Sequence, residues 1–257
     1  MRKLAIGALF VLILLLPLEM AGADKPGAPA TKPNVLLIIV DDLNDYEGAF
    51  GGHPQARTPN IDKFADQATR FVSAYSNIPV CQPSRNSLFT GVYPHDSLDY
   101  DWVPQHEHAV LQHNKTLIDL FNENGYLTLG TGKLMHGGLT AVWDVWGNTP
   151  KHDYGPFPYN GQEATVTPNV PEPFRKIGPI DGGFGRLSEV RSEGVRGEPG
   201  WILGWDNAPM RYLSDVDRDL TPDERQAQWV VQRGAERAKN PDQPFFMAVG
   251  FVRPHTP

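Results

Sequence analysis

The longest apolar runs of the chain predict strands. Residues Asn34–Val40 and Pro244–Val252 are almost entirely apolar and rich in β-branched, leucine and aromatic side chains. Runs of this kind are typical of strands that are covered on both faces in a parallel sheet. Shorter apolar stretches predict two further strands, at Tyr126–Gly130 and Phe71–Tyr75. We therefore expect a sheet with its central strands buried between two layers.

Between these runs, apolar positions recur at helical spacing. A helix is predicted to begin at Thr58-Pro59, because threonine can cap a helix and proline suits its first turn. Another is predicted from Thr221 to about Lys239, where Thr-Pro-Asp-Glu is a capping-box pattern. Further helices are expected at Pro83–Phe89 and Thr116–Asn124. Alternating strands and helices predict an α/β fold, in which helices sandwich a mostly parallel sheet.

The domain organisation follows from composition along the chain. Residues 137–213 are dense in glycine and proline but also carry several tryptophans and other aromatic residues. This composition predicts an ordered, loop-rich insertion rather than disorder. The insertion lies within a single region, 34–257, that holds all the predicted strands and helices.

The first residues are typical of a secretory signal. Arg2 and Lys3 precede an apolar run from Leu4 to Leu16, and small residues follow at Ala21-Gly22-Ala23. We predict a signal peptide at 1–23 and a linker at 24–33, because the apolar run is too short to span a bilayer. The expected location is periplasmic or extracellular, with no stable membrane insertion after cleavage. An uncleaved anchor is the alternative.

Composition and charge exclude several classes of protein. The chain has 257 residues, of which 40% are hydrophobic. It contains one cysteine and carries a formal charge of −7. The apolar content excludes a wholly disordered chain, and the acidic balance argues against a nucleic-acid binder. A single cysteine excludes an internal disulfide and any multi-cysteine metal site.

Two adjacent aspartates, Asp41 and Asp42, end the first predicted strand. Ligands bind at the carboxyl ends of strands in open α/β sheets. Two neighbouring carboxylates repel each other unless a cation neutralises them, and oxygen ligands suit Ca²⁺ or Mg²⁺. The pair is therefore a candidate metal site, and the alternative is a solvated acidic loop.

The single cysteine, Cys81, lies just before a predicted helix that begins at Pro83. The positive end of that helix and the nearby Arg85 would favour an anion beside the thiol. The alternative for an isolated cysteine is a buried structural thiol.

Residues 81–85, Cys-Gln-Pro-Ser-Arg, match the C-x-P-S-R signature of the type I sulfatases of the alkaline-phosphatase superfamily. The resemblance covers nearly the whole chain after the signal peptide and also includes Asp41-Asp42, Thr58–Asp62, Gly130–His136 and Phe245–His255. The Lys133/His136 spacing and the Phe-Phe-x-Ala-Val-Gly run look most like the iduronate-2-sulfatase branch.

This resemblance implies a function and a set of site residues. In the family, a maturase oxidises the motif cysteine to formylglycine, whose hydrate attacks sulfur and later expels sulfate. The resemblance implies that Asp41, Asp42 and residue 81 hold Ca²⁺, with Mg²⁺ as the other possibility. It implies that Arg85 holds the modified residue and that Lys133 contacts sulfate.

The resemblance also assigns roles to two histidines. His136 matches the histidine near the hydrated aldehyde, and His255 matches the one that can protonate the leaving alcohol. The expected function is a secreted sulfatase acting on a sulfated carbohydrate.

The chain departs from the family pattern at its end. It stops at Pro257, whereas the family's second pair of metal ligands comes later, so we expect a C-terminally truncated, N-terminal part of the fold. A catalytically silent remnant or a sulfated-glycan-binding fragment is therefore the alternative function. A phosphohydrolase is a third, less favoured reading, because those enzymes normally place serine or threonine where Cys81 stands.

Overall fold

The structure is a computed structural model that describes residues 32–136, 139–148, 154–167, 169–176, 186–204 and 206–255. The predicted signal peptide, and the predicted linker apart from its last two residues, lie outside the described residues. Among the helices of the described part, none is long and apolar enough to cross a membrane.

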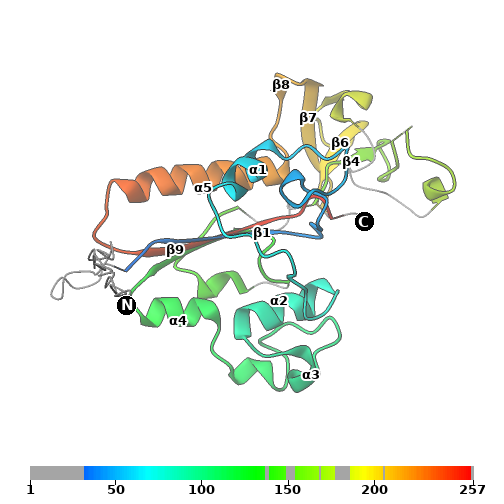
Figure 1. Cartoon of the computed structure of the whole chain (residues 1–257). Coiled ribbons are helices and arrows are strands. Elements are labelled where there is room, and N and C mark those ends of the chain that lie inside the picture. The colour runs from blue at the N-terminus through cyan, green and yellow to red at the C-terminus, as the bar shows by residue number, and fades with distance from the viewer. Residues whose placement is uncertain are drawn as a thin grey trace, which may run out of the picture. The chain divides into compact units, whose positions relative to one another are not determined.

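A parallel sheet forms the centre of the fold (Figure 1). Its strands are β1 (Val35–Val40), β9 (Phe245–Phe251), β2 (Leu127–Gly132) and β3 (Val145–Trp146), hydrogen-bonded in that order. Each neighbouring pair is parallel, as the continuous apolar runs predicted. The last strand in the sequence, β9, therefore lies between the first two, which brings the carboxyl ends of β1, β2 and β9 to one edge.

Two glycines let the chain cross this edge closely. Gly132 ends β2 with a φ of 75°, a left-handed conformation that glycine adopts without strain. A Cβ atom on Gly250 of β9 would lie 1.9 Å from the carbonyl oxygen of Lys133. Neither position accommodates a larger residue. With glycine at both, the backbone of Lys133 passes close to the end of β9 and donates its N–H to Gly250 O at 2.9 Å.

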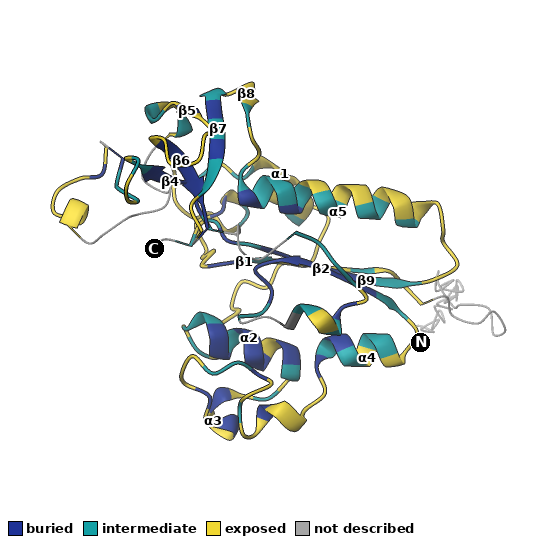
Figure 2. Ribbon diagram, turned by 180° about the vertical axis from the view of Figure 1, so that it is seen from behind, coloured by how far each residue is buried: buried dark blue, intermediate teal, exposed yellow. Residues whose placement is uncertain are grey.

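Helices cover both faces of the sheet (Figures 1 and 2). Helix α5 (Pro222–Ala238) lies on one face, against β9 and β2. Helices α2 (Cys81–Thr90) and α4 (Leu117–Glu123) lie on the other. Thr116 and Asp119 form a capping box that begins α4.

The core lies between the sheet and helices α2 and α4. Phe246 of β9 stacks on Phe121 of α4, with ring centroids 4.1 Å apart. The fully or nearly fully buried members of this core are Phe89, Ile118, Leu134, Trp143, Phe246 and Ala248. Burying each large apolar side chain stabilises the fold by roughly 1.5–3 kcal/mol.

The predicted loop-rich insertion contains a small antiparallel sheet. Its strands are β4 (Phe157–Tyr159), β6 (Gly200–Leu203), β7 (Ala208–Ser214), β5 (Ser192–Glu193) and β8 (Asp217–Arg218). Trp201, Leu203, Met210 and Tyr212 form its own core. This antiparallel sheet continues through β8, a few residues beyond the predicted end of the insertion at 213.

The remaining described elements are short. They are helices α1 (Pro59–Ala65) and α3 (Pro94–Ser97), and the 3-10 turns Gly48–Phe50, Leu111–His113, Leu139–Val142, Phe174–Lys176 and Leu187–Glu189. Helix α1 begins at the proline where the sequence predicted it.

Three local predictions differ from the structure. Strand β1 is not covered on both faces as expected, since it lies at the edge of the sheet and Leu36 and Ile38 are 51% and 54% exposed. The strand expected at Phe71–Tyr75 is wrong: none of the described strands pairs with this segment, and Tyr75 is 88% exposed. A strand needs a hydrogen-bonding neighbour, which local apolar composition does not supply. Helix α2 begins at Cys81, two residues before the predicted Pro83, so that the cysteine is the first helical residue.

Candidate functional site

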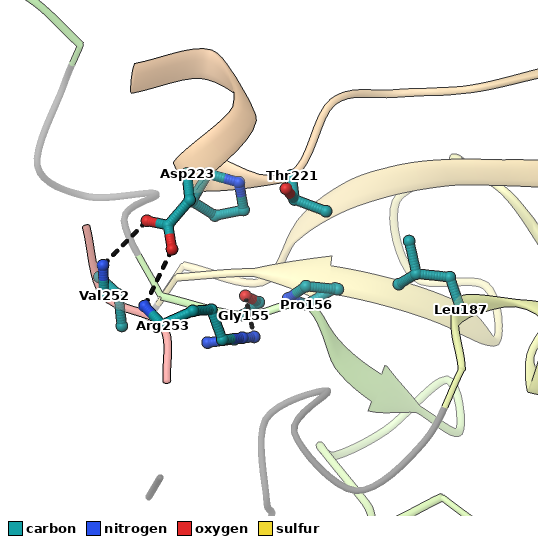
Figure 3. Close-up of a pocket in the computed structure, with 8 residues that line it drawn as sticks. Gly155, Pro156, Leu187, Thr221, Asp223, Val252 and Arg253 are labelled. Carbon is teal, nitrogen blue, oxygen red and sulfur yellow. Dashed lines mark hydrogen bonds between the residues drawn. The ribbon is translucent and has the colours of Figure 1, made fainter. Parts of the chain in front are cut away.

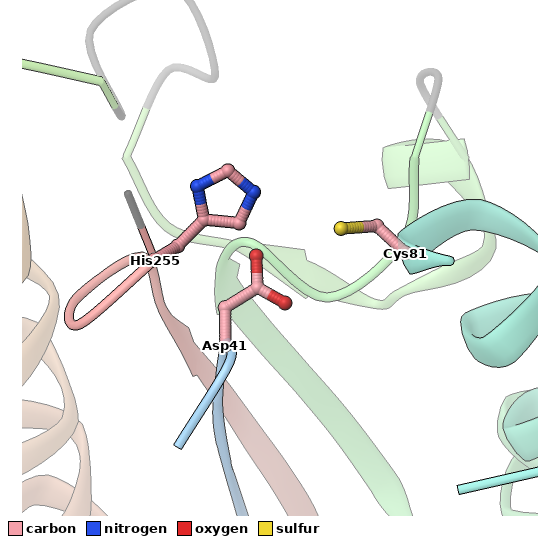
Figure 4. A group of neighbouring side chains, drawn as sticks. All are labelled: Asp41, Cys81 and His255. Carbon is pink, nitrogen blue, oxygen red and sulfur yellow. The ribbon is translucent and has the colours of Figure 1, made fainter. Parts of the chain in front are cut away.

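The predicted site residues converge at one edge of the parallel sheet. Asp41 directly follows β1, Lys133 follows β2, and His255 follows β9 by four residues. Cys81 opens α2 on the facing side, as Figure 4 shows for Asp41, Cys81 and His255. The parallel order of the strands explains how residues as far apart in the sequence as Asp41 and His255 meet at one edge.

Asp41 is the buried anion of this site. Its carboxylate accepts a hydrogen bond from Arg85 Nη2 at 2.7 Å and forms an ion pair with Lys133 Nζ. Burial raises the pKa of Asp41, but the hydrogen bonds and charges of Lys133 and Arg85 outweigh it and hold the pKa below its ordinary value. Asp41 is therefore ionised at neutral pH and neutralised by two cations.

Arg85 joins α2 to the ends of two strands. Besides Asp41, its guanidinium donates to the backbone carbonyl of Leu134 at 3.0 Å and to that of Lys133. The side chain is 6% exposed. Arg85 therefore fixes the helix that carries Cys81 relative to the turn that carries Lys133.

Lys133 presents its ammonium group to the thiol. Nζ lies 3.9 Å from Cys81 Sγ and 5.1 Å from the centroid of the Tyr154 ring. Burial lowers the pKa of Lys133, but hydrogen bonding to Asp41 and Tyr154 outweighs it and raises the pKa above its ordinary value. The ammonium therefore stays charged over the whole physiological range.

Cys81 is a half-buried free thiol at the start of a ten-residue helix. The first N–H groups of a helix have no partner within the helix, so they and Lys133 give this position a positive potential. A cavity of about 440 Å³ opens between the end of β1 and the start of α2. Its walls include Asp41, Asp42, Ser76, Cys81, Ser84 and Arg85.

The two predicted histidines differ in their surroundings. The imidazole of His136 packs edge-on against the Trp102 ring, with ring centroids 5.1 Å apart. Burial, together with the charges of Lys133 and Arg85, lowers its pKa to about 4. His136 is therefore a neutral imidazole at pH 7, in a state that can accept a proton.

His255 lies on the opposite side of Asp41 from α2 (Figure 4). Its Nε2 is 3.8 Å from Asp42 Oδ2. Its ring packs edge-on against that of Tyr154, with ring centroids 6.2 Å apart. His255 therefore contacts both Asp42 and the Tyr154 ring of the insertion.

A hard divalent cation fits part of this donor set. One ligand atom from each of Asp41, Cys81 and His255 lies within 4.8 Å of the others. Asp42 is exposed, has a φ of 57° and is not one of these three residues, although its Oδ2 lies 3.8 Å from His255 Nε2. The two carboxylates suit Ca²⁺, which takes roughly six to eight oxygen ligands. The described residues supply only part of that number, and Lys133 and Arg85 already neutralise Asp41.

Tyr154 belongs to this site but was not predicted from the sequence. It lies in the glycine- and proline-rich insertion, between Lys133 and His255, and contacts both side chains. Nothing in the local pattern around residue 154 distinguishes it from the other aromatic residues of the insertion. Only the folding of the insertion against the sheet edge brings it here.

Comparisons with known proteins identify the family. The model of the sulfatase family matches residues 33–257. A sulfatase from Formosa agariphila is 32% identical over 232 residues, which are 88% of this chain and 40% of that protein. Human iduronate 2-sulfatase is 31% identical over 225 residues, which are 87% of this chain and 35% of that protein.

The fold has a solved counterpart. The crystal structure of Ps i-CgsB superimposes with a TM-score of 0.51 at 25% identity, over 88% of this chain and 46% of that chain. The chain thus spans less than half the length of each protein it is compared with here. The family match over 33–257 confirms the resemblance of the Cys-Gln-Pro-Ser-Arg segment, and the chain belongs to the sulfatase family.

Proposed function

We propose that this chain carries the nucleophile-bearing part of a sulfatase that hydrolyses a sulfate ester of a sugar. The observation that carries the proposal is the position of Lys133 Nζ, 3.9 Å from Cys81 Sγ and paired with Asp41. A fixed cation beside a nucleophile position at a helix N-terminus suits a tetrahedral anion such as sulfate.

Cys81 is the site of modification in this proposal. Oxidation to formylglycine supplies a hydrated aldehyde, one hydroxyl of which is the nucleophile toward sulfur. Arg85 keeps residue 81 facing the cavity through its bonds to Asp41 and to the carbonyl of Leu134. Lys133 binds a sulfate oxygen and balances the charge that develops on it.

The two histidines supply proton transfer. His136, neutral at pH 7, accepts a proton from residue 81. His255, next to Asp42, donates a proton to the sugar oxygen as the S–O bond breaks. Ester cleavage needs a base and an acid, and the proposal assigns these roles to His136 and His255.

Asp41, Asp42 and residue 81 would hold the divalent cation. Ca²⁺, or Mg²⁺ in its place, would neutralise sulfate oxygens and lower the pKa of the attacking hydroxyl.

The remaining assignments belong to the same proposal. The substrate is a sulfated carbohydrate, supported by relatives such as the one named iduronate 2-sulfatase. We assign residues 34–257 to the catalytic region, 137–213 to an insertion in it, and 1–23 to a signal peptide for export. A formylglycine-generating maturase is then a required partner.

The test is co-expression of the full chain with a maturase, followed by peptide mass spectrometry at residue 81 and a sulfate-release assay. We expect an aldehyde at residue 81 and sulfate release from sulfated sugars. An intact thiol, or an aldehyde without sulfate release, would contradict the hydrolytic proposal.

The alternative is a sulfated-glycan binder without turnover. It is favoured by the pairing of Asp41 with both Arg85 and Lys133, because this pairing leaves a pocket that is neutral or cationic without any metal. Glycan binding by the unmodified chain in the presence of EDTA, without sulfate release after maturation, would support this alternative.

A further inference from the structure

The segment that carries His255 is held from outside the site by an acid on α5. Asp223 Oδ1 accepts the backbone N–H of Val252, and Asp223 Oδ2 accepts that of Arg253, both at 2.9 Å. Figure 3 shows the carboxylate facing the two nitrogens. One carboxylate therefore binds two consecutive N–H groups at the point where β9 ends.

The same segment is closed by further hydrogen bonds. The N–H of His255 donates to Val252 O at 2.9 Å, and Arg253 Nη2 donates to Gly155 O at 2.7 Å. Gly155 directly follows Tyr154, whose ring contacts His255. The turn 252–255 is therefore fixed on one side by Asp223 and on the other by the insertion.

Ordinary helix stabilisation does not account for this contact. Asp223 occupies the first turn of α5, where an acid interacts favourably with the helix dipole. Glu224 occupies the same turn, but it completes the capping box of Thr221 and pairs with Arg218. Only one of these two acids reaches the end of β9, so their effects on His255 can be separated.

We propose that Asp223 is a positioning residue for His255: it fixes the turn 252–255 so that the imidazole stands where it protonates the leaving sugar oxygen. The inference rests on the proposed function. It assigns a role to a residue that has no direct contact with Cys81, Lys133 or Asp41 in the described interactions. A shift of about 1 Å in a proton donor lowers a rate by up to about 100-fold.

The test compares Asp223→Ala and Asp223→Asn with Glu224→Gln, all in the matured full chain. Each protein is assayed with a sugar sulfate, whose leaving group needs a proton, and with 4-nitrophenyl sulfate, whose leaving group does not. We expect the Asp223 variants to lower kcat on the sugar sulfate about 10- to 100-fold with little change on the aryl sulfate. Asparagine, which keeps one acceptor oxygen, should lose less than alanine, and Glu224→Gln should match the wild type on the sugar sulfate.

A double-mutant cycle separates positioning from a general loss of structure. In a His255→Ala background, Asp223→Asn should have no further effect on kcat, because the group it positions is gone. Equal losses on both substrates, or a further loss in the His255→Ala background, would overturn the proposal.

Hydrogen exchange tests the same contact without activity. The peptide that contains Val252 and Arg253 should exchange faster in Asp223→Ala than in the wild type and in Glu224→Gln. Unchanged exchange would overturn the positioning role. If the wild type releases no sulfate, the proposed function fails, and the catalytic role of the turn 252–255 fails with it. The exchange data still decide whether Asp223 fixes this turn.

Discussion

Arg85 Nη2 donates to Asp41 Oδ1 at 2.7 Å, and the side chains of both residues are less than a tenth exposed. The pair joins the first turns of α2 to the end of β1. Since the same guanidinium also bonds to the carbonyl of Leu134, one side chain ties together the segments that carry Cys81, Asp41 and Lys133. The site is thus assembled around a buried cation.

Replacing Arg85 should therefore cost stability as well as activity. Arg85→Met leaves backbone carbonyls and one carboxylate oxygen of Asp41 without their donor. We expect a loss of about 3 kcal/mol in the free energy of unfolding, measured by urea denaturation, because each buried acceptor left without a donor costs about 1–3 kcal/mol.

An exposed arginine supplies the control for that loss. Arg191 pairs with Glu193 on the surface, where both side chains are more than half exposed. Arg191→Met should change the free energy of unfolding by less than about 1 kcal/mol. Similar losses for the two arginines would contradict the structural role of Arg85.

Cys81→Ala should remove sulfate release and leave the fold intact. The thiol is half-buried, and its only hydrogen-bond contact among the described side chains is the 3.9 Å contact with Lys133. We expect turnover at the background rate and a change of less than about 1 kcal/mol in the free energy of unfolding. Turnover by Cys81→Ala at the wild-type rate would exclude residue 81 as the nucleophile.

His136 should make stability depend on pH. Its pKa is about 4 in the folded chain, against an ordinary value of 6.5. The unfolded chain thus takes up a proton near pH 6.5 that the folded chain accepts only near pH 4. The stabilisation from neutral His136 is complete above pH 6.5 and is lost as the pH falls towards 4.

Urea midpoints between pH 7.5 and pH 4 measure this effect, and His136→Gln should flatten the decrease. His106→Gln, at an exposed loop histidine, serves as the control and should follow the wild-type curve. Parallel curves for the wild type and His136→Gln would show that His136 is not buried in a cationic environment.

Tyr154 should contribute to activity through its ring. Tyr154→Leu removes the aromatic ring that Lys133 Nζ lies over, and with it the ring contact to His255. We expect kcat for sulfate release to fall about 10-fold, because both side chains lose a wall that fixes them. Tyr154→Phe keeps the ring and should retain most of the activity. An equal loss in both variants would instead assign the effect to the phenolic hydroxyl.

The sequence by itself determined the local elements of the main sheet. Continuous apolar runs predicted β1 and β9 within one residue of their bounds, because such runs are typical of strands, although only β9 is buried along most of its length. The capping-box pattern Thr221–Glu224 predicted the start of α5. The Cys-Gln-Pro-Ser-Arg segment predicted the family together with the other matching segments, because so many motifs in the family's order are specific.

Only the tertiary structure decided which residues meet. The order β1-β9-β2-β3 depends on pairings between distant segments, such as Val35 with Phe246 and Leu127 with Phe245, and no local pattern records them. Tyr154 and Asp223 serve the site through such contacts, so local sequence reasoning did not find them. The apolar segment Phe71–Tyr75 shows the converse, since strand composition forms no strand without a neighbour to pair with.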